Sequence, residues 1–546
     1  MGLKHLKKVR IVVSLLFFLL TFLLFIDFRH ILPEKFINYL LYLQFAPSMM
    51  KFITVVGIAA LGFLIVIVLT LLFGRVYCSS VCPLGTLQDG ISHISKRVQK
   101  RNKKKKKIYK YNRPHNWWRY GFLVVVVIFL LAGSVFALNL LDPFSNFGRI
   151  SVNLIKPIYI GINNIIANTL LKLDLFWLYP AKYGKIDWIF LLYPSAILGV
   201  ITWMSYRKGR LYCNAICPVG TFLGLISRFS LFKIRISDSE CNNCGLCEWD
   251  CKSNCIDKVN KHVDFSRCVN CFNCFTVCKK DAMTYKMSWQ KKPVSKKPVP
   301  VHMATADESK RSFIAGSAVI LMSIFGFKLN KMPSGNYDNA SLANPGEITS
   351  SRPTIIPEAK DFPVTPPGAS TIRKFTDRCT ACHLCVSACP THVIQPSLTQ
   401  YGLTGFMQPH MDYHAGFCNF ECTICMDVCP AGALLPVSLE EKKLIQLGKA
   451  VFIKENCVVE TDGTDCGACS EHCPTKAVDM IPYHDGLFIP QVTEDICIGC
   501  GACEYACPTK PYKAIFVNGN AVHVNAQKPQ QEALDIDIDY TEDFPF

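Results

Sequence analysis

Residues 497–508 read Cys-Ile-Gly-Cys-Gly-Ala-Cys-Glu-Tyr-Ala-Cys-Pro, which is a Cys-x2-Cys-x2-Cys-x3-Cys-Pro stretch. This spacing is typical of a 4Fe–4S ligand loop, in which closely spaced thiolates hold one cluster. Three more groups of four cysteines precede it, two of them with x3 and x8 as their first spacing, and all end in Cys-Pro. The first two groups are Cys379, Cys382, Cys385 and Cys389, and Cys418, Cys422, Cys425 and Cys429. The last two are Cys457, Cys466, Cys469 and Cys473, and Cys497, Cys500, Cys503 and Cys507. Residues 373–516 are therefore predicted to bind four 4Fe–4S clusters.

Residues 241–278 hold two further groups with the spacing of a two-cluster bacterial ferredoxin. The groups are Cys241, Cys244, Cys247 and Cys251, and Cys268, Cys271, Cys274 and Cys278. In such a module the fourth thiolate of each group crosses to the other cluster. Zinc sites also use Cys-x2-Cys pairs, but the doubled motif favours iron and sulfur. Lys252 and Lys279 stand where proline usually follows the motif, and Cys255 is left over as an alternative to Cys251. We expect six 4Fe–4S clusters in the whole chain.

The composition points to membrane segments in the first half of the chain. Half of the 546 residues are apolar, and the mean hydropathy is +0.23. Four apolar runs, Ile11–Ile26, Ile53–Phe73, Tyr120–Leu138 and Trp188–Tyr206, approach or reach the length needed to span a bilayer. The 29 cysteines are clustered, which argues against a disulfide framework.

The distribution of charge predicts the orientation of these spans. Residues 1–330 carry a net charge of +30, and residues 331–546 a net charge of −12. The basic residues lie beside the apolar runs, as in the block Lys103–Lys107, so the positive-inside rule explains them better than nucleic-acid binding does. The rule predicts a cytoplasmic N-terminus and outward-facing loops at 27–52 and 139–187.

A repeat follows the second and the fourth apolar run. Residues 74–86 and 209–221 are identical at eight of thirteen positions, and both contain Gly-Arg-x-Tyr-Cys-x3-Cys-Pro. Cysteines four residues apart share one face of a helix, and the proline then breaks the helix. Related by a two-fold axis, the repeats would bring together Cys78, Cys82, Cys213 and Cys217 as a soft-metal or dithiol site. Four packed structural thiols remain the alternative.

Haem is not expected. The stretch from Cys379 to His383 fits the Cys-x-x-Cys-His attachment motif of c-type haem, but Cys385, Cys389 and Pro390 complete a ferredoxin motif instead. No histidine lies inside the four apolar runs, whereas membrane b-type haems usually need axial histidines.

The second cysteine-rich region is expected to be exported. Ser309-Lys310-Arg311-Ser312-Phe313-Ile314 and the apolar run that follows look like a twin-arginine signal. The expected fold is a membrane α-helical bundle, with four spans and a fifth signal-anchor span, joined to two α+β bacterial-type ferredoxin modules. The domains are a four-span domain (1–237), a cytoplasmic ferredoxin (238–290), a linker with the signal (291–311), the fifth span (312–329), a flexible linker (330–372), an extracytoplasmic four-cluster module (373–516) and an acidic tail (517–546).

Two family resemblances cover most of the chain. With its two Cys-x3-Cys-Pro motifs and the double ferredoxin motif, the first part resembles the NapH family and the related NosR and CcoG families. With the stretch from Phe417 to Cys422 and the four Cys-Pro endings, residues 309–515 resemble the NapG and MauM families. The chain thus looks like a NapH–NapG fusion, although Lys310 replaces an arginine of the signal. The resemblance implies that the first cysteine group of the exported module pairs with the last, and the second with the third.

The resemblance also implies a function. It suggests a bacterial inner-membrane electron-transfer protein of the quinol dehydrogenase type, linking the quinone pool to an exported redox partner. A quinone, and a metal at the four repeat cysteines, are the additional cofactors to expect. One alternative is a copper reductase or assembly factor of the CcoG type, in which those cysteines bind copper. The other is a redox-sensing regulatory ferredoxin of the NosR type.

Overall fold

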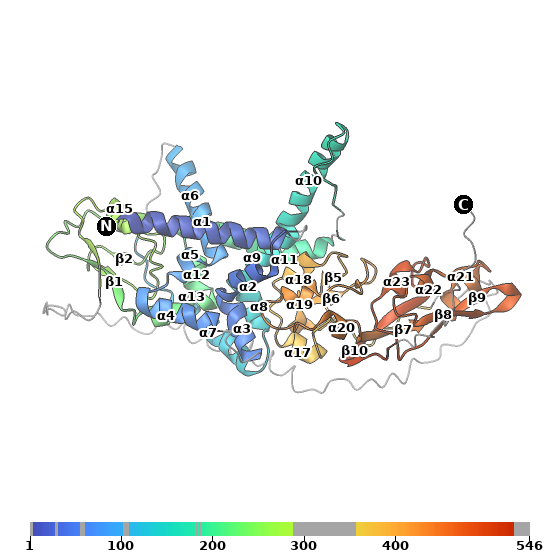
Figure 1. Cartoon of the computed structure of the whole chain (residues 1–546). Coiled ribbons are helices and arrows are strands. Elements are labelled where there is room, and N and C mark those ends of the chain that lie inside the picture. The colour runs from blue at the N-terminus through green and yellow to red at the C-terminus, as the bar shows by residue number, and fades with distance from the viewer. Residues whose placement is uncertain are drawn as a thin grey trace, which may run out of the picture. The chain divides into compact units, whose positions relative to one another are not determined.

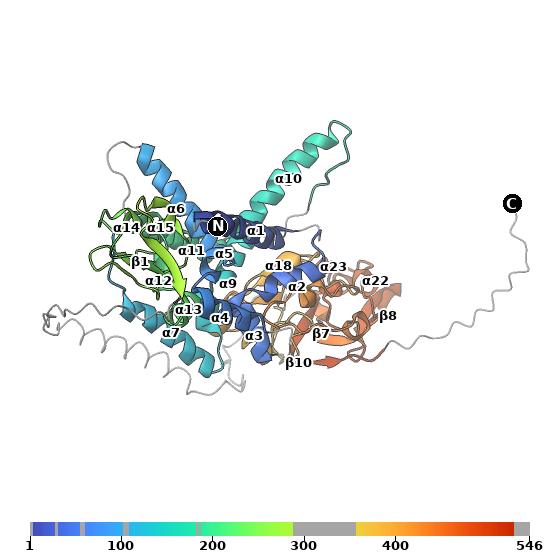
Figure 2. The same cartoon turned by 60° about the vertical axis from the view of Figure 1, so that its left-hand side comes forward.

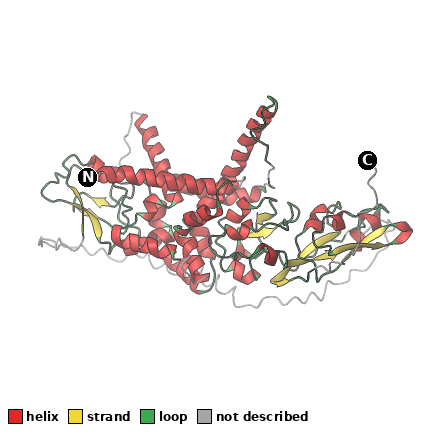
Figure 3. Cartoon of the chain, viewed as in Figure 1, coloured by secondary structure: helices red, strands yellow, loops and turns green. Residues whose placement is uncertain are grey.

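A computed structural model describes residues 4–27, 31–54, 61–101, 109–181, 184, 187–287 and 356–528 (Figure 1). The described residues belong to one compact unit, which joins Met1–Trp289 to Thr354–Phe546. Helices dominate the N-terminal part, and short strands appear in both cysteine-rich parts (Figure 3). The linker 291–311, the fifth span 312–329 and most of the linker 330–372 lie outside the described residues, as does the tail beyond residue 528.

The N-terminal part is built from helices that pack around a common apolar core. The helices are α1 (Lys4–Ile26), α2 (Glu34–Tyr42), α3 (Phe45–Thr54), α4 (Gly62–Phe73), α5 (Tyr77–Ser80), α6 (Pro83–Arg101), α7 (Asn116–Leu131), α8 (Phe136–Leu141), α9 (Pro143–Ile150), the π-helix η2 (Ser151–Ile155), α10 (Lys156–Leu171), α11 (Trp188–Lys208), α12 (Leu211–Ala215) and α13 (Pro218–Ser227). Within the described residues, three helical stretches are long and apolar enough to cross a membrane: His5–Ile26, Pro143–Leu171 and Trp188–Lys208. The helices α4, α7 and α13 are apolar but shorter.

Two of the four expected spans differ from the prediction. In the run Ile53–Phe73 the helix α4 begins only at Gly62, and residues 55–60 are outside the described part. The run Tyr120–Leu138 contains a break, because α7 ends at Leu131 and Gly133 has a φ of 76°. Glycine adopts this left-handed conformation without a steric penalty and commonly ends helices. A hydropathy window averages over such a break and therefore misses it.

The prediction of an outward loop at 139–187 is wrong for much of its length. The carboxylate of Asp142 accepts hydrogen bonds from Ser145 N (2.8 Å) and Ser145 Oγ (2.7 Å) and so caps α9, which begins at Pro143. Both residues are typical of a helix start. The helices η2 and α10 continue directly from α9 to Leu171. The segment was expected to be a loop only because it lies between the third and the fourth apolar run.

The first ferredoxin module contains two small antiparallel sheets and two single-turn helices. Its elements are β1 (Phe232–Ile236), α14 (Leu246–Asp250), β2 (Ile256–Asp257), β3 (His262–Val263), α15 (Asn273–Val277) and β4 (Met283–Met287). Strand β1 pairs with β4, from Phe232↔Met287 to Ile236↔Met283, and β2 pairs with β3. The sheets cover the buried thiols, with Ile234 and Met283 in the same apolar core.

The second module is longer and repeats this arrangement. Its elements are α17 (Ile372–Thr376), α18 (Leu384–Ala388), β5 (Ile394–Pro396), η3 (Leu403–Gly405), β6 (Pro409–Met411), α19 (Ile424–Asp427), α20 (Leu439–Lys442), β7 (Ile445–Phe452), η4 (Lys454–Asn456), α21 (Val458–Thr461), α22 (Ala468–Glu471), β8 (Val478–Pro482), η5 (His484–Gly486), β9 (Phe488–Val492), α23 (Ala502–Ala506) and β10 (Ile515–Asn525). The strand pairs are β5–β6, β7–β10 and β8–β9. Because β10 continues to Asn525, the domain boundary expected at residue 516 is too early.

Four of the six cysteine groups share a left-handed turn. In each, the second and fourth residues after the first cysteine have a positive φ. These residues are Asn243 and Gly245, Asn270 and Phe272, Ala381 and His383, and Gly499 and Gly501. L-residues seldom adopt this conformation, and here it curls the chain so that three thiols point inward. The groups with x3 and x8 spacings lack this pair of residues.

Candidate iron–sulfur centres and a buried four-thiol site

The cysteines of the first module converge in two sets of four. One set is Cys241, Cys244, Cys247 and Cys278, which interact electrostatically with one another. The other set lines one cavity and consists of Cys251, Cys268, Cys271 and Cys274. The fourth cysteine of each motif thus lies with the first three of the other motif, as the spacing predicts.

Cys255 lies beside this second set. Its Sγ is 3.5 Å from Cys251 Sγ, and it lines the same cavity. A hydrogen bond from the Cys255 thiol and further ones from backbone N–H groups lower the pKa of Cys251, while the pKa of Cys255 is raised. Because a thiolate is the form that ligates metal, this environment favours Cys251 as the ligand and Cys255 as its hydrogen-bond donor.

The second module forms four sets, and their pairing differs from the one that the resemblance implied. The first two sets are Cys379, Cys382 and Cys385 with Cys429, and Cys418, Cys422 and Cys425 with Cys389. The other two are Cys497, Cys500 and Cys503 with Cys473, and Cys457, Cys466 and Cys469 with Cys507. The first group therefore pairs with the second, and the third with the fourth. The expected pairing of first with last is wrong for this chain, because the sheet β5–β6 holds the first two groups together.

Cys466 shows how the x8 spacing of the third group is accommodated. The inserted residues form α21 (Val458–Thr461) and a loop, and Cys466 then returns to the cavity that Cys457, Cys469 and Cys507 also line. Cys466 is partly buried, whereas those three thiols are buried. The resemblance implied that the group of Cys466 pairs with the second group. That expectation is wrong, because Cys466 shares its cavity with Cys507 of the fourth group. The strand pair β7–β10 joins the third group to the fourth.

The iron content of double variants tests this pairing. Cys389→Ser and Cys425→Ser should each remove one cluster, a loss of about four iron atoms per chain. Since both residues belong to one set, the double variant should lose no more than either single variant. Cys389→Ser combined with Cys503→Ser should lose about twice as much, because two clusters are affected. Iron analysis of the purified proteins measures these losses. A larger loss from Cys389→Ser with Cys425→Ser than from Cys389→Ser with Cys503→Ser would restore the pairing of the first group with the last.

The four sets form a chain that begins at the membrane part. Cys382 is buried in the same apolar core as Phe25 and Phe144. Cys418 N donates a hydrogen bond to Cys500 O (2.9 Å), which joins the first pair of sets to the second pair. The set that includes Cys457 therefore lies at the far end of this chain.

The two ferredoxin modules contact opposite ends of α1. Near its start, Lys7 Nζ donates to Thr276 Oγ1 in α15 (3.1 Å). Near its end, Phe25 O accepts a hydrogen bond from Ser387 Oγ in α18 (2.6 Å). A helix of 23 residues is about 34 Å long, which is close to the thickness of the apolar core of a bilayer.

The repeated Cys-x3-Cys-Pro motifs form a single buried site. The prolines begin α6 and α13, so each motif breaks where the sequence predicts. All four thiols are buried, and they interact electrostatically with one another. These thiols, Cys78, Cys82, Cys213 and Cys217, are called the four-thiol site below.

Two arginines lock the repeats together by crossing between them. Arg210 Nη1 donates to Cys78 O (2.5 Å), and Arg75 Nη2 donates to Cys213 O (3.3 Å). A side chain at Gly85 would strike Cys78 O, and one at Gly220 would strike Cys213 O. The same contacts thus occur twice, as a two-fold relation between the repeats requires.

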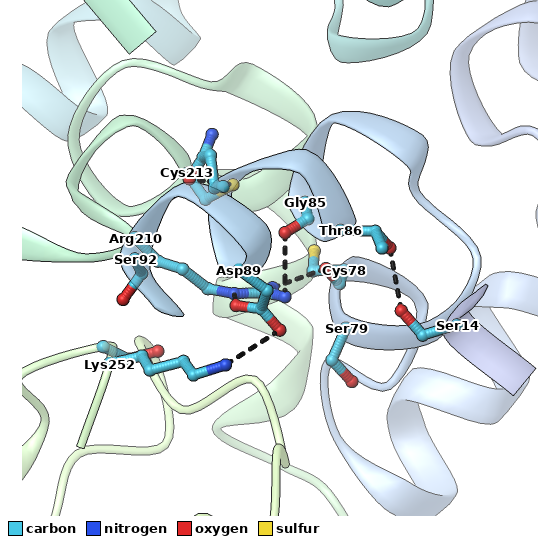
Figure 4. Close-up of polar contacts among 12 residues, drawn as sticks. Ser14, Cys78, Ser79, Gly85, Thr86, Asp89, Ser92, Arg210, Cys213 and Lys252 are labelled. Carbon is cyan, nitrogen blue, oxygen red and sulfur yellow. Dashed lines mark hydrogen bonds and ion pairs between the residues drawn. The ribbon is translucent and has the colours of Figure 1, made fainter. Parts of the chain in front are cut away.

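Asp89 breaks this symmetry and ties the site to the first ferredoxin module (Figure 4). Its carboxylate accepts from Arg210 Nε (2.8 Å) and Arg10 Nη1 (3.0 Å) and lies 3.4 Å from Lys252 Nζ. Burial alone would raise the pKa of Asp89, but the charges of Arg210 and Lys252 outweigh it and hold the pKa well below its usual range. Lys252 follows the ligand candidate Cys251 directly, so the network spans from a cluster set to the four-thiol site.

Asp142, at the start of α9, contacts the repeats and the second module. It interacts electrostatically with Tyr77 and Tyr212, the residues that precede Cys78 and Cys213. It also interacts with Cys382 of the second module. The four-thiol site therefore lies between a cluster set of the first module and one of the second.

The thiols of each set are not gathered as tightly as the ligands of a single tetrahedral ion would be. Among the described residues, only Glu358, His414 and Glu504 bring three candidate ligand atoms within 4.8 Å of one another. A single tetrahedral ion with metal–sulfur bonds near 2.3 Å would need thiols about 3.8 Å apart. In the described part of the chain, no three thiols of a ferredoxin set or of the four-thiol site all lie within 4.8 Å of one another.

The site also contains residues that the sequence analysis missed. Arg75 and Arg210 carried a signal, because both belong to the repeated motif. Asp89 and Asp142 carried none, since each is a single acidic residue outside the repeated stretches 74–86 and 209–221. His383 is not available to a haem, because Nε2 contacts Met407 O (2.9 Å) and Nδ1 contacts Asn153 Nδ2 (3.0 Å).

Three family models of iron–sulfur domains match segments of the chain. Residues 55–102 and 190–237 match a family described as a 4Fe-4S binding domain. Residues 378–434 and 464–510 each match a family described as a 4Fe-4S dicluster domain. The only cysteines in the first match are those of the four-thiol site. The dicluster matches agree with pairing the first group with the second and the third with the fourth.

Several known proteins are similar to parts of this chain. An uncharacterized protein of Methanocaldococcus jannaschii is 27% identical over 222 residues, which are 41% of this chain and 68% of that protein. Regulatory protein NosR of Stutzerimonas stutzeri is 27% identical over 210 residues, 37% of this chain and 23% of NosR. The methylamine utilization ferredoxin-type protein MauM of Methylophilus methylotrophus is 31% identical over 145 residues, 24% of this chain and 61% of MauM. No solved structure matches.

These likenesses and the helices together describe the protein in general terms. The 4Fe-4S domains accompany helices that are long and apolar enough for a membrane. The relatives include a regulatory protein and ferredoxin-type proteins. The chain is a membrane-associated ferredoxin-type protein that transfers electrons through iron–sulfur centres.

Proposed function

We propose that the protein carries electrons between the quinone pool of a bacterial inner membrane and an exported redox partner. In this proposal it is a NapH–NapG type fusion, with the first ferredoxin module in the cytoplasm and the second outside. The observation that carries the proposal is the contact of the two modules with opposite ends of α1.

The charge of the two parts supports this orientation. The start of α1 bears Lys4, Lys7, Lys8 and Arg10, and basic residues mark the cytoplasmic ends of spans. The first module contacts this same end. Residues 331–546 are acidic, and the second module, which they include, contacts the other end of α1. An acidic module outside the membrane would suit a basic exported partner.

The position of the four-thiol site supports a continuous electron path. It lies between the Cys251 set and the Cys382 set and is joined to them through Asp89 and Asp142. A bound cluster supplies one-electron chemistry, with a potential set by hydrogen bonds, charge and solvent access. This chain's own residues shield the site from water and hold the repeats together.

Reduction by a quinol is the first test. Adding a menaquinol analogue to the purified, oxidised protein should bleach the visible absorption of its clusters and produce the electron paramagnetic resonance signals of reduced 4Fe–4S centres. Dithionite gives the fully reduced reference. If the spectrum stays that of the oxidised protein while dithionite still reduces it, the quinol assignment fails, and a regulatory role of the kind named for NosR becomes the better explanation.

The orientation needs a separate measurement. A tag fused after Phe546 should be cleaved by protease in intact spheroplasts, and a tag before Met1 should be cleaved only after lysis. Protection of both tags until lysis would put both modules in the cytoplasm and would overturn the exported partner.

A further inference from the structure

A pocket opens between two candidate spans and the second ferredoxin module. It holds about 680 Å³ of empty space, its open mouth included. One wall consists of η2, the first turns of α10 and the start of α11, and the other of the segment from Val386 to Pro396. Figures 1 and 2 both show the base of α10 beside α18. Elsewhere on these helices, Ile162 and Leu192 are exposed as lipid-facing residues would be.

Lys156 is the unusual residue of this pocket. It is a buried cation, 6% exposed, inside a stretch apolar enough to span a membrane. Charged residues inside such stretches are costly and usually functional. Its Nζ donates to Ser387 O (2.6 Å) and Ser387 Oγ (2.9 Å). An ammonium has three N–H donors, so one remains for a ligand in the pocket.

Further polar groups face the same space from other directions. Asn153 uses its amide nitrogen on Arg149 O and His383, which leaves its oxygen as an acceptor. The ring of His392 and the carboxylate of Asp187 line the pocket, and within the described part of the chain neither makes a hydrogen bond. The pocket thus offers one donor and several acceptors around an apolar interior, as small-molecule sites commonly do.

The pocket also reaches the first two cluster sets of the second module. Val386 follows the ligand candidate Cys385, and Lys156 interacts electrostatically with Cys389. The opposite wall of the pocket includes the π-helix η2, and π-helical turns often occur at functional sites. A ligand here must be soluble in lipid, flat enough for the space and able to both accept and donate hydrogen bonds. The reduced, quinol form of a membrane quinone has these properties, because each ring hydroxyl both donates and accepts, and the oxidised ring still accepts a hydrogen bond from Lys156.

We propose that this pocket binds the ring of a membrane quinone, with one ring oxygen on Lys156 and the other toward His392 and Asp187. The apolar tail leaves between α10 and α11 into the lipid. This inference rests on the proposed function, since it names the place where the quinone pool meets the protein.

Binding of a fluorescent hydroxyquinoline N-oxide, a quinone analogue, tests the site without any turnover. The probe should show saturable quenching with the purified protein in its oxidised state. Ile160→Phe fills the pocket, because Ile160 lines it, and Lys156→Met removes the donor. Each should weaken binding at least about tenfold. Ile162→Phe is the matched control on the same helix; it is 52% exposed and should bind as the unaltered protein does. Unchanged cluster spectra after dithionite show that each variant is folded.

The possible outcomes distinguish a failure of the proposed quinone site from a failure of the proposed function. Unaltered probe binding by Ile160→Phe would overturn the site, and so would a menaquinol analogue that reduces this variant as fast as the unaltered protein. If added anionic phospholipid displaces the probe from the unaltered protein, the pocket is assigned to a lipid headgroup instead. If the probe binds as expected but quinol fails to reduce the clusters of the unaltered protein, the proposed function fails and the binding site stands.

Discussion

In inside-out membrane vesicles, Cys78→Ser protein should keep its lumenal clusters oxidised after dithionite is added outside, whereas the unaltered protein should reduce them. In such vesicles the cytoplasmic face points outward, and the charged dithionite does not cross the bilayer. If the vesicles are reconstituted from quinone-free lipid, electrons can reach the second module only through the protein. The four-thiol site lies between the modules, so the loss of one thiol should lower lumenal reduction to the rate seen when no dithionite is added.

Two comparisons make this result specific. Cys213→Ser should behave as Cys78→Ser does, because the two residues are equivalent in the repeat. Ser79→Ala, in the same helix α5, should leave the rate unchanged, since the Ser79 hydroxyl donates only to Val76 O within its own turn. After solubilisation in detergent, dithionite should reduce all clusters in every variant. Lumenal reduction at the unaltered rate in both cysteine variants would exclude the four-thiol site from the path.

Asp89→Asn should lower the free energy of unfolding by about 3–5 kcal/mol, the usual cost of breaking a buried ion pair from one side. The substitution leaves Arg210, fully buried, and Arg10, nearly so, without their counter-charge. Because Lys252 loses its partner as well, the first ferredoxin module should detach from the helices before they unfold. Thermal unfolding followed by cluster absorption, together with limited proteolysis, measures both effects.

Asp238→Asn is the matched control for this prediction. Asp238 lies in the same module and is 3.6 Å from Lys261, but its side chain is 89% exposed. Exposed ion pairs contribute about 0–1 kcal/mol, so this variant should unfold close to the unaltered protein. Equal stability of Asp89→Asn and Asp238→Asn would mean that water or relaxation compensates the buried arginines.

The cysteine motifs were readable from the sequence because their chemistry is local. Three thiols within seven residues, as in Cys241, Cys244 and Cys247, converge through one left-handed turn whatever surrounds it. The breaks at Pro83 and Pro218 were equally predictable, because proline restricts the residue before it. The repeat likewise predicted that Cys78 and Cys213 would meet, since similar sequences fold into similar units.

Other features were beyond any local pattern. The pairing of Cys389 with the second group, and of Cys466 with Cys507, depends on which hairpins pack together, and neighbouring motifs of nearly equal spacing do not distinguish the possibilities. The break at Gly133 was hidden because hydropathy averages over it, and the helices from Pro143 to Leu171 were missed because this stretch is less apolar than the other two candidate spans.

Short-range spacing therefore established what this protein binds: clusters held by cysteine motifs, beside helices suited to lipid. Only the tertiary structure determined how these parts are connected. It joined residues as distant as Arg10, Asp89, Arg210 and Lys252 in one buried network, and it placed Lys156 against Ser387. Such contacts arise because a charge removed from water must find a partner wherever packing provides one, and sequence distance does not reveal where that is.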